Sequence, residues 1–347
     1  MLISRTPYRI SFFGGGTDYP TWYNENGGAV LATSINHYCY ITCRNLPPFF
    51  RHKHRIVYSV IEDVQETDQI KHPAVRECIK FMRIQHGLEI HHDGDLPARA
   101  GLGSSSSFTV GLLHALHALR GEMPTRLQLA LEAIHIERDL IAENVGSQDQ
   151  MTAAFGGLNL IRFEPGDRIL VQPLTLRLER IRVLAAHLML FFTGFSRHAS
   201  EIAAEQIKNI PNKRDELQTM RTMVDQALEI LRGDGDIREF GRLLHQSWLL
   251  KRSLSTKISS PHLDEIYAKA MSSGALGGKL LGAGGGGFML FFVEPERQGE
   301  LLKAMGNLLH VPFAFESLGS QIIFYEPEGR QSLTPSARLI SSAFHYV

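Results

Sequence analysis

The chain has 347 residues, of which 44% are hydrophobic and 21% charged, and this is the composition of an ordinary soluble globular protein. It carries 36 Lys and Arg against 36 Asp and Glu, and a zero net charge argues against nucleic acid or a membrane surface as a partner. The length exceeds that of most single hydrophobic cores and favours two domains.

The N-terminus and the cysteines favour a cytoplasmic protein. Residues 1–8 lack the apolar segment of a signal peptide, and the longest apolar run, residues 183–192, is too short to span a bilayer. The cysteines Cys39, Cys43 and Cys78 are odd in number and lack metal-site spacing, so we interpret them as reduced thiols. We therefore expect a cytoplasmic enzyme or binding protein.

The first predicted element is a strand over residues 8–13, in which apolar and polar residues alternate. It runs into the loop Gly14-Gly15-Gly16-Thr17-Asp18-Tyr19-Pro20, which needs the backbone freedom of glycine. Asp18 is a polar group on this loop, and a turn-forming role is the simpler interpretation of a lone Asp beside glycine.

Residues 28–44 are predicted to form one or two strands, with apolar runs at 29–32 and 39–43, and a compact basic run follows them, Arg51-His52-Lys53-His54-Arg55. A solvated hairpin turn explains such a run, and an anion site is the alternative. The next elements are predicted as a strand, a helix and a strand, over residues 56–60, 73–86 and 88–92.

The most informative segment of the chain is a glycine- and serine-rich motif, Pro97-Ala98-Arg99-Ala100-Gly101-Leu102-Gly103-Ser104-Ser105-Ser106-Ser107. A helix is predicted to follow, with Ser104 as its N-cap. Free N–H groups at a helix start and close-approaching glycines form a phosphate cradle, and a hydroxyl can also bind Mg²⁺. The alternative is a Ser/Gly linker before a capped helix. The helix has one apolar stripe, formed by Phe108, Leu112, Leu116 and Leu119.

Thr125 is predicted to cap a second helix over about 127–142, which carries Glu137 in its last two turns. The turn that ends it, residues 144–150, contains Asp149, for which a turn or cap role and a catalytic role are both open from this residue alone. A short helix and two strands are expected next, at 151–155, 157–163 and 169–174.

A second unit is predicted to begin near Glu179 with a strand-rich segment, 181–193. Its glycine cluster, residues 277–287, leads into an apolar strand over 288–293. A helix is expected near His198, and residues 327–347 are turn-rich and predicted to be a peripheral tail. Further helices are expected over 214–232, 237–254, 261–273 and 295–309, and two strands that close the unit over 311–315 and 321–325.

Three glycine-rich loops in one chain can enclose a single ligand between two domains. Phosphoryl transfer requires a cradle for the donor phosphates, Mg²⁺, a group that orients or deprotonates the acceptor hydroxyl, and a cation near the acceptor. A carboxylate can take the proton of a sugar hydroxyl, whereas an arginine stays charged and cannot be the base. The chain offers candidates for each requirement.

Three motifs resemble those of the GHMP kinases, the family that contains galactokinase, homoserine kinase, mevalonate kinase and phosphomevalonate kinase. They are residues 7–19, similar to the sugar-binding motif of galactokinase, residues 97–107, and the glycine cluster 278–287. The triple glycine Gly14-Gly15-Gly16 and the sequence from Lys279 to Phe288 are similar to the branch that acts on heptose 7-phosphate. Fucose kinase shares parts of these motifs.

The resemblance implies an α+β fold with GHMP kinase architecture. Residues 1–178 would form a domain like the second domain of ribosomal protein S5 that binds ATP and sugar. Residues 179–330 would form a ferredoxin-like α+β domain, with 331–347 as the tail. ATP and substrate would meet at the junction of the two domains, with the adenine pocket unassigned beyond the region 57–63.

The resemblance also implies roles for individual residues. Asp149 matches the catalytic aspartate, Arg9 the cation beside the acceptor hydroxyl, and Asp18 a group that accepts a sugar hydroxyl. Glu137 matches the Mg²⁺-binding glutamate, and Ser105, or its neighbour Ser104, the Mg²⁺-binding serine. The ATP-binding residues would be Pro97, Ala100, Gly101, Leu102, Gly103, Ser104, Ser105, Ser106 and Ser107. The substrate-binding residues would be Gly15, Gly16, Thr17, Asp18, Arg197, Gly284 and Gly285.

The function implied is ATP- and Mg²⁺-dependent phosphorylation of the anomeric hydroxyl of D-glycero-D-manno-heptose 7-phosphate, in nucleotide-activated heptose synthesis for bacterial surface polysaccharide. One rival is a kinase for an unphosphorylated sugar such as fucose or galactose. Another is a non-catalytic sugar- or nucleotide-binding regulator on the same scaffold. The partners expected are small molecules, with no nucleic acid and no membrane, and a homodimer is left open. A substrate phosphate would need an anion pocket, for which the candidates are Lys53, Arg55, Arg197, Lys251, Arg252 and Lys257.

Overall fold

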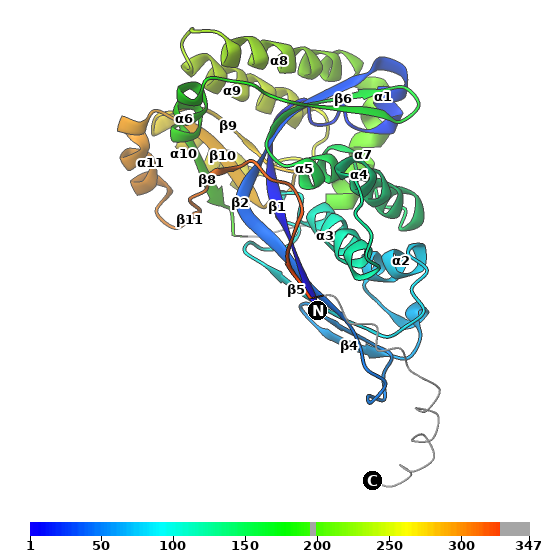
Figure 1. Ribbon diagram of the computed structural model, residues 1–347. Helices are drawn as coiled ribbons and strands as arrows, with labels where there is room; N and C mark the ends of the chain where they lie inside the picture. The colour runs from blue at the N-terminus through cyan, green and yellow to red at the C-terminus, as the bar shows by residue number, and fades with distance from the viewer. Residues whose placement is uncertain (195–198, 327–347) are drawn as a thin grey trace, which may run out of the picture.

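The computed structural model describes residues 1–194 and 199–326, which are organised around two sheets (Figure 1). The larger is a nine-stranded sheet, and the smaller has four strands in the order β11-β8-β10-β9. Helices pack on both, so the predicted α+β class is confirmed.

The larger sheet is built on two long antiparallel strands, β1 (Leu2–Phe13) and β2 (Gly28–Asn45). Of the one or two strands expected over residues 28–44, the structure forms one, because β2 continues through the polar residues between 29–32 and 39–43. The chain near residue 314 pairs with that middle part, where Asn36 donates its backbone N–H to the Ala314 carbonyl at 3.0 Å. Strand β2 is long enough to pair with β6 along its first part and with β5 along its second.

The remaining strands of this sheet extend it on both sides. Strand β13 pairs with β1, and β3 and β4 lie beyond β5. Their bounds are β3 (His54–Val57), β4 (Ile61–Val64), β5 (Leu88–Gly94), β6 (Leu158–Glu164), β7 (Arg168–Pro173), β12 (Phe315–Glu316) and β13 (Gln321–Tyr325).

Helix α3 (Ser104–Leu119) packs against β1 and β2, as its predicted apolar stripe requires (Figure 1). Thr125 caps the next helix as predicted, since its side chain accepts the Gln128 N–H. That helix ends earlier than predicted, and a π-helical turn over His135–Leu140 follows it and carries Glu137. The helices of this unit are α1 (Pro20–Asn26), α2 (Pro73–Phe81), α4 (Arg126–Ile134) and α5 (Gln148–Phe155), with a 3₁₀ turn at Thr67–Gln69.

The second unit contains the smaller sheet and the helices around it. Its first segment is a helix followed by one strand, whereas the sequence predicts strands over 181–193. Leu, Arg and Ala favour a helix, and a short apolar run does not distinguish a helix from a strand. The strands are β8 (Leu188–Phe192), β9 (Ala275–Leu280), β10 (Phe288–Val293) and β11 (Leu309–His310). The helices are α6 (Leu178–Ala186), α7 (Ala199–Asn209), α8 (Arg214–Arg232), α9 (Arg238–Ser253), α10 (Pro261–Ser272) and α11 (Gln298–Met305), with 3₁₀ turns at Ile210–Asn212 and Pro295–Arg297.

The last two strands do not close the second unit as expected. Strand β12 pairs with β2, and β13 pairs with β1 beside the N-terminus. Both strands contain apolar residues that could pair in either sheet. Which sheet they join therefore depends on the path of the chain after β11. The end of the described chain therefore belongs to the larger sheet.

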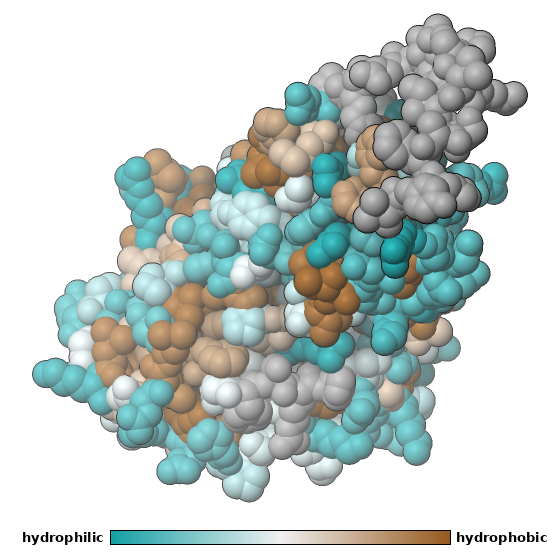
Figure 2. Space-filling model, turned by 90° about the horizontal axis from the view of Figure 1, so that it is seen from below, coloured by the Kyte–Doolittle hydropathy of each residue, from teal (hydrophilic) through white to brown (hydrophobic). Residues whose placement is uncertain are grey.

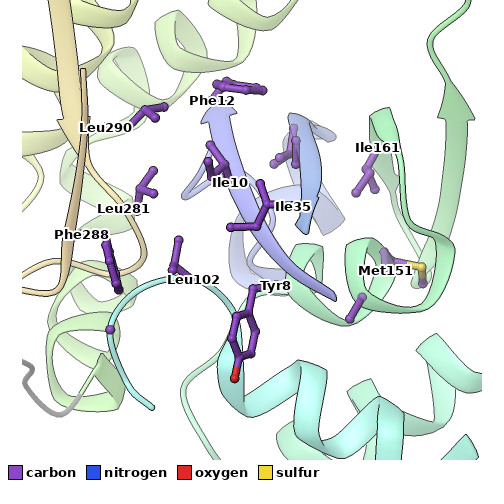
Figure 3. Close-up of a cluster of buried hydrophobic side chains, with 14 of the residues drawn as sticks. Tyr8, Ile10, Phe12, Ile35, Leu102, Met151, Ile161, Leu281, Phe288 and Leu290 are labelled. Carbon is purple, nitrogen blue, oxygen red and sulfur yellow. The ribbon is translucent and has the colours of Figure 1, made fainter. Parts of the chain in front are cut away.

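One continuous core joins the two units (Figure 3). Ile10 and Phe12 of β1 lie on one side of it, with Leu281 and Phe288 of the second unit on the other, and Leu102 between them. Phe12 also meets Phe240 of α9 edge to face, with ring centroids 5.5 Å apart. Such aromatic pairs add about 1 kcal/mol to the burial of their area. The core therefore fixes the loop around Leu102 between the units.

The surface seen from below is mostly hydrophilic with several separate hydrophobic areas (Figure 2). In residues 1–194 and 199–326, helices fall short of the length and apolar character needed to cross a membrane.

Candidate active site

A cavity of about 740 Å³ opens between the two units. Its wall is formed by the end of β1 and the glycine loop after it, the loop before α3, the segment before α5, and parts of α7, α9 and β9. We call it the central cavity. Its volume lies in the range of small-molecule sites, roughly 300–1,000 Å³.

Arg9 of β1 and Asp149 of α5 form a bidentate ion pair on this wall. Arg9 Nε and Nη2 donate to the two carboxylate oxygens of Asp149, each at 2.7 Å, and Nη1 donates to the Gly101 carbonyl at 2.6 Å. The Arg9 side chain is 4% exposed and that of Asp149 25%, so Asp149 is the more accessible member. The two parallel bonds fix the plane of the carboxylate.

The ion pair lies at the N-terminal end of α3. A Cβ built on Gly103, the residue before the helix, would lie 3.1 Å from Arg9 Cγ and 3.4 Å from Asp149 Oδ2. Gly103 also has a left-handed backbone with φ 73°, which favours glycine at this position. The structure thus brings together the predicted phosphate cradle and the predicted catalytic carboxylate.

Gly103, rather than the predicted Ser104, is the N-cap of α3, and within the described part of the chain the helix has no side-chain cap. The Ser104 hydroxyl instead accepts the Arg99 N–H at 3.0 Å and shapes the preceding loop. The first helical hydrogen bond runs from the Ser107 N–H to the Gly103 carbonyl. The earlier N–H groups therefore lack a side-chain cap, which is the condition for anion binding at a helix start.

Asp18 also lines the central cavity and is 2% exposed. Burial raises the pKa of its carboxyl, and the nearby Asp149 carboxylate raises it further, while the Gly16 N–H bond at 2.9 Å opposes the shift. A Cβ on Gly146 would lie 1.9 Å from Asp18 Oδ2, so the loop before α5 can pass this carboxyl only because it has glycine there. Asp18 is thus held tightly, with a reduced tendency to ionise.

Glu137 lies in the π-helical turn over His135–Leu140, close to the serines at the start of α3, and is 1% exposed. Its Oε2 accepts hydrogen bonds from Ser106 Oγ at 2.8 Å and Gln150 Nε2 at 2.5 Å. Within the described chain its Oε1 lacks a hydrogen-bond donor, since the nearby Thr109 hydroxyl donates to the Ser105 carbonyl at 3.2 Å. Burial raises the pKa of Glu137 to about 7.

Two lysines of the second unit line the central cavity, Lys251 of α9 and Lys279 of β9. Lys279 Nζ donates to the carbonyls of Ser11 and Phe12 at 2.9 and 2.8 Å, which ties β9 to β1. Lys251 Nζ donates to the carbonyls of Leu280 and Gly282. Sequence reasoning missed Lys279, although a lysine inside a glycine cluster was a signal.

Aromatic and imidazole rings form another part of the wall, which sequence reasoning also missed. His72 stacks on Phe108 with ring centroids 4.7 Å apart, and Tyr58 and His92 meet these rings at their edges. Burial lowers the pKa of His72 to about 4, so its ring is neutral at pH 7. Of the region 57–63 that the resemblance indicates for adenine, Tyr58 and Ser59 line the cavity.

Several predicted site residues lie elsewhere than expected. Gly15 and Gly16 line the cavity, but the Thr17 hydroxyl is buried and bonds the Gly14 and Ala29 carbonyls. Gly282 and Ala283 line it in place of Gly284 and Gly285, which are buried beside Ile258 because Gly285 donates its N–H there. Of the predicted ATP-binding residues, Gly101, Gly103, Ser104, Ser105 and Ser106 line the cavity, whereas Ala100, Leu102 and Ser107 are buried and Pro97 is exposed outside it.

The candidate cations for anion binding lie in different places relative to the central cavity. Lys251 lines the central cavity, whereas Arg55, Arg252 and Lys257 form ion pairs with Asp63, Asp264 and Glu205 away from it. Lys53 lies at the start of the β3–β4 hairpin, and Arg197 lies outside the described residues.

Comparison with known families gives two matches. The model described as GHMP kinases N terminal domain matches residues 57–157, and the model described as GHMP kinases C terminal matches residues 223–310. Together they cover more than half of the chain.

Similar proteins and structures agree with these matches. D-glycero-alpha-D-manno-heptose 7-phosphate kinase of Campylobacter jejuni is 29% identical over 313 residues, covering 87% of this chain and 92% of its own. The crystal structure of a D-glycero-D-manno-heptose 1-phosphate kinase from Bacteroides thetaiotaomicron superposes with a TM-score of 0.77 and 25% identity, over 94% of this chain and 100% of that one. A galactokinase of Lactococcus lactis complexed with galactose has a TM-score of 0.72 at 20% identity, over 92% of this chain and 94% of that one, and shows the shared fold.

Proposed function

The chain belongs to the GHMP kinases, phosphotransferases that act on an alcohol group, and we propose that its acceptor is a heptose that already carries a phosphate. More specifically, we propose that it transfers the γ-phosphoryl group of ATP to the anomeric hydroxyl of D-glycero-D-manno-heptose 7-phosphate and yields the 1,7-bisphosphate. The product would enter nucleotide-activated heptose synthesis for bacterial surface polysaccharide.

The observation that carries the proposal is the position of Asp149 beside Gly103, at the open end of α3. ATP placed with its triphosphate on the uncapped N–H groups of α3 would present its terminal phosphate to this carboxylate. Its base would then lie toward the rings of Tyr58, His72 and Phe108, which offer flat apolar faces. The acceptor would occupy the other end, beside Gly15, Gly16 and Asp18.

Asp149 and Arg9 divide the chemistry between them. Each Asp149 oxygen accepts one bond from Arg9 and has a further lone pair for the sugar hydroxyl. Asp149 therefore orients this hydroxyl and accepts its proton as the bond to phosphorus forms. Arg9 keeps its proton and stabilises the negative charge that develops between acceptor and phosphate.

The residues present fit a magnesium ion near Glu137. Its buried Oε1 without a donor, together with hydroxyls at the start of α3, offers the hard oxygen ligands that Mg²⁺ prefers. We propose Glu137 and Ser105 as its ligands, as expected from the sequence, although the serine that contacts Glu137 in the structure is Ser106. Bound Mg²⁺ would neutralise the charge of the nucleotide phosphates.

The names of the two heptose relatives place the phosphate differently, on carbon 7 in one and on carbon 1 in the other. A coupled ADP-release assay with heptose 7-phosphate, heptose 1-phosphate, unphosphorylated heptose, L-fucose and D-galactose separates the alternatives. We expect turnover with the 7-phosphate and ³¹P NMR evidence of a new anomeric phosphate. Equal turnover with and without the 7-phosphate would contradict the proposal, and binding without turnover would favour a regulator.

A further inference from the structure

Lys251 is a buried cation without a carboxylate partner on the wall of the central cavity. It is 7% exposed, and no ion pair joins it to Asp or Glu in residues 1–194 and 199–326. Its ammonium has three N–H groups, and the carbonyls of Leu280 and Gly282 take two of them. One donor of Lys251 thus has no acceptor in the described part of the chain.

The groups around Lys251 leave this charge uncompensated. Arg9 and Asp149 neutralise one another through their two 2.7 Å hydrogen bonds. Asp18 is buried with a raised pKa, and the neighbouring Lys279, whose pKa is held well below its usual value by burial, brings no negative charge and donates to backbone carbonyls. Burial, followed by the charge of Arg9, lowers the pKa of Lys251 to about 7. A buried, unpaired ammonium is costly, and an anion brought by a ligand would remove that cost.

Lys251 lies at the acceptor end of the cavity. Its charge is felt by Arg9, Asp18 and Asp149, the groups assigned to the acceptor hydroxyl. The carbonyl of Gly282, to which it donates, belongs to a residue that also lines the cavity. The aromatic part of the wall, by contrast, is formed by residues of the first unit.

We propose that Lys251 binds a phosphate oxygen in the acceptor half of the central cavity. This rests on the proposed function, because it takes the acceptor to be a sugar phosphate. The phosphate can come from two sources, the substituent that the acceptor already carries or the phosphoryl group in transfer. The geometry favours Lys251 among the five candidate cations that the structure describes, because it lines the cavity and has no acidic partner within the described residues.

The test compares Lys251→Gln with Lys251→Arg and with the control Lys269→Gln. Glutamine keeps an amide donor for the backbone carbonyls but has no charge, and Lys269 is an exposed lysine on α10 of the same unit. Circular dichroism and thermal unfolding establish that each variant is folded before kinetics are measured. The acceptors are heptose 7-phosphate and unphosphorylated heptose, and isothermal calorimetry with a non-hydrolysable ATP analogue measures nucleotide binding.

If Lys251 binds the acceptor's own phosphate, Lys251→Gln raises KM for heptose 7-phosphate about tenfold or more, the magnitude of one lost charged hydrogen bond. Turnover of unphosphorylated heptose then stays at the wild-type level. If it binds the phosphoryl group in transfer, kcat falls for both acceptors and KM changes little. Lys251→Arg restores part of the loss in either case, and Lys269→Gln behaves as wild type.

A folded Lys251→Gln protein with unchanged kcat and KM for both acceptors would overturn the proposal and leave Lys251 a structural role. So would a loss that Lys251→Arg fails to restore. If wild-type protein does not turn over heptose 7-phosphate, the proposed function fails instead. Calorimetry of wild type and Lys251→Gln with inorganic phosphate then still tests the lysine, because weaker phosphate binding by the variant supports the inference and equal binding overturns it.

Discussion

Arg9 and Lys251 are both buried cations on the wall of the central cavity, but the chain balances their charges differently. Arg9 has a carboxylate partner in Asp149, whereas the partners of Lys251 among the described residues are the carbonyl oxygens of Leu280 and Gly282. The first arrangement is complete without a ligand and fixes a carboxylate in one orientation. The second is incomplete, because backbone dipoles do not neutralise a full charge. The first unit thus contributes an ion pair whose charges are balanced, and the second unit a buried cation whose charge is not balanced by a described carboxylate.

The largest effect is expected from Asp149→Asn. The amide keeps the size of the side chain and can still accept from Arg9, but it cannot take a proton, so kcat should fall by about a thousandfold. Affinity for an ATP analogue, measured by calorimetry, should stay close to wild type. Asp225→Asn on the exposed face of α8 is the control. Activity retained by Asp149→Asn would exclude Asp149 as the proton acceptor.

Arg9→Met should reduce kcat by about a hundredfold, since it removes one charge that stabilises the transition state. Arg9→Met differs from Asp149→Asn in a second respect, because Arg9 Nη1 also donates a hydrogen bond to the Gly101 carbonyl at 2.6 Å. The loop before α3 loses this bond, so the affinity for the ATP analogue should weaken too. Steady-state kinetics and calorimetry on both variants measure the difference, and unchanged nucleotide affinity in Arg9→Met would show that the loop does not depend on Arg9.

Gly101→Ala tests the contact between the loop before α3 and the backbone of Leu281. Gly101 has φ +87°, and a Cβ there would lie 2.5 Å from the Leu281 carbonyl oxygen. Backbone strain and overpacking together should lower the free energy of unfolding by about 2–4 kcal/mol in urea titrations. Gly166→Ala is a matched control, because Gly166 has φ +77° but no atom of the described residues lies within 4 Å of its Cβ position. It should cost only about 1–2 kcal/mol from backbone strain, and equal losses in both variants would argue against the contact.

The smallest effect is the pH dependence of acceptor binding. Burial lowers the pKa of Lys251 to about 7, so its charged fraction falls as pH rises above 7. Affinity for heptose 7-phosphate should fall by at most about tenfold for each pH unit above the pKa, since one proton is involved. The charged groups facing Lys251 are Arg9 on β1, Asp18 on the loop after β1, Asp149 on α5 and Lys279 on β9.

Lys251→Arg should remove this fall in affinity, since a guanidinium stays charged throughout the range. The measurement is KM for heptose 7-phosphate between pH 6.5 and 9 in wild type and in this variant. Parallel pH profiles in the two proteins would assign the dependence to another group.

Local patterns were sufficient for much of the fold. The limits of α8 and β10 agree with the prediction, because a long amphipathic period and a wholly apolar run after glycines are strong local signals. Thr125 was identified as a cap from its position alone. The sequence did not predict helix α6, because its short apolar run has no clear period. It placed the last two strands in the second unit, although β12 and β13 pair with β2 and β1, because pairing partners are not encoded locally.

The sequence by itself was sufficient to indicate the GHMP kinase family, and it singled out the loop 97–107 and Arg9, Asp149, Asp18 and Glu137 as candidates for the site. Only the tertiary structure decided which of these groups meet. It paired Arg9 with Asp149, placed Gly282 and Ala283 rather than Gly284 and Gly285 at the cavity wall, and put Lys251 on that wall, unlike the other candidate cations among the described residues. The physical reason is that a motif fixes residue types along the chain, whereas burial and charge compensation depend on segments that are distant in sequence and adjacent in space.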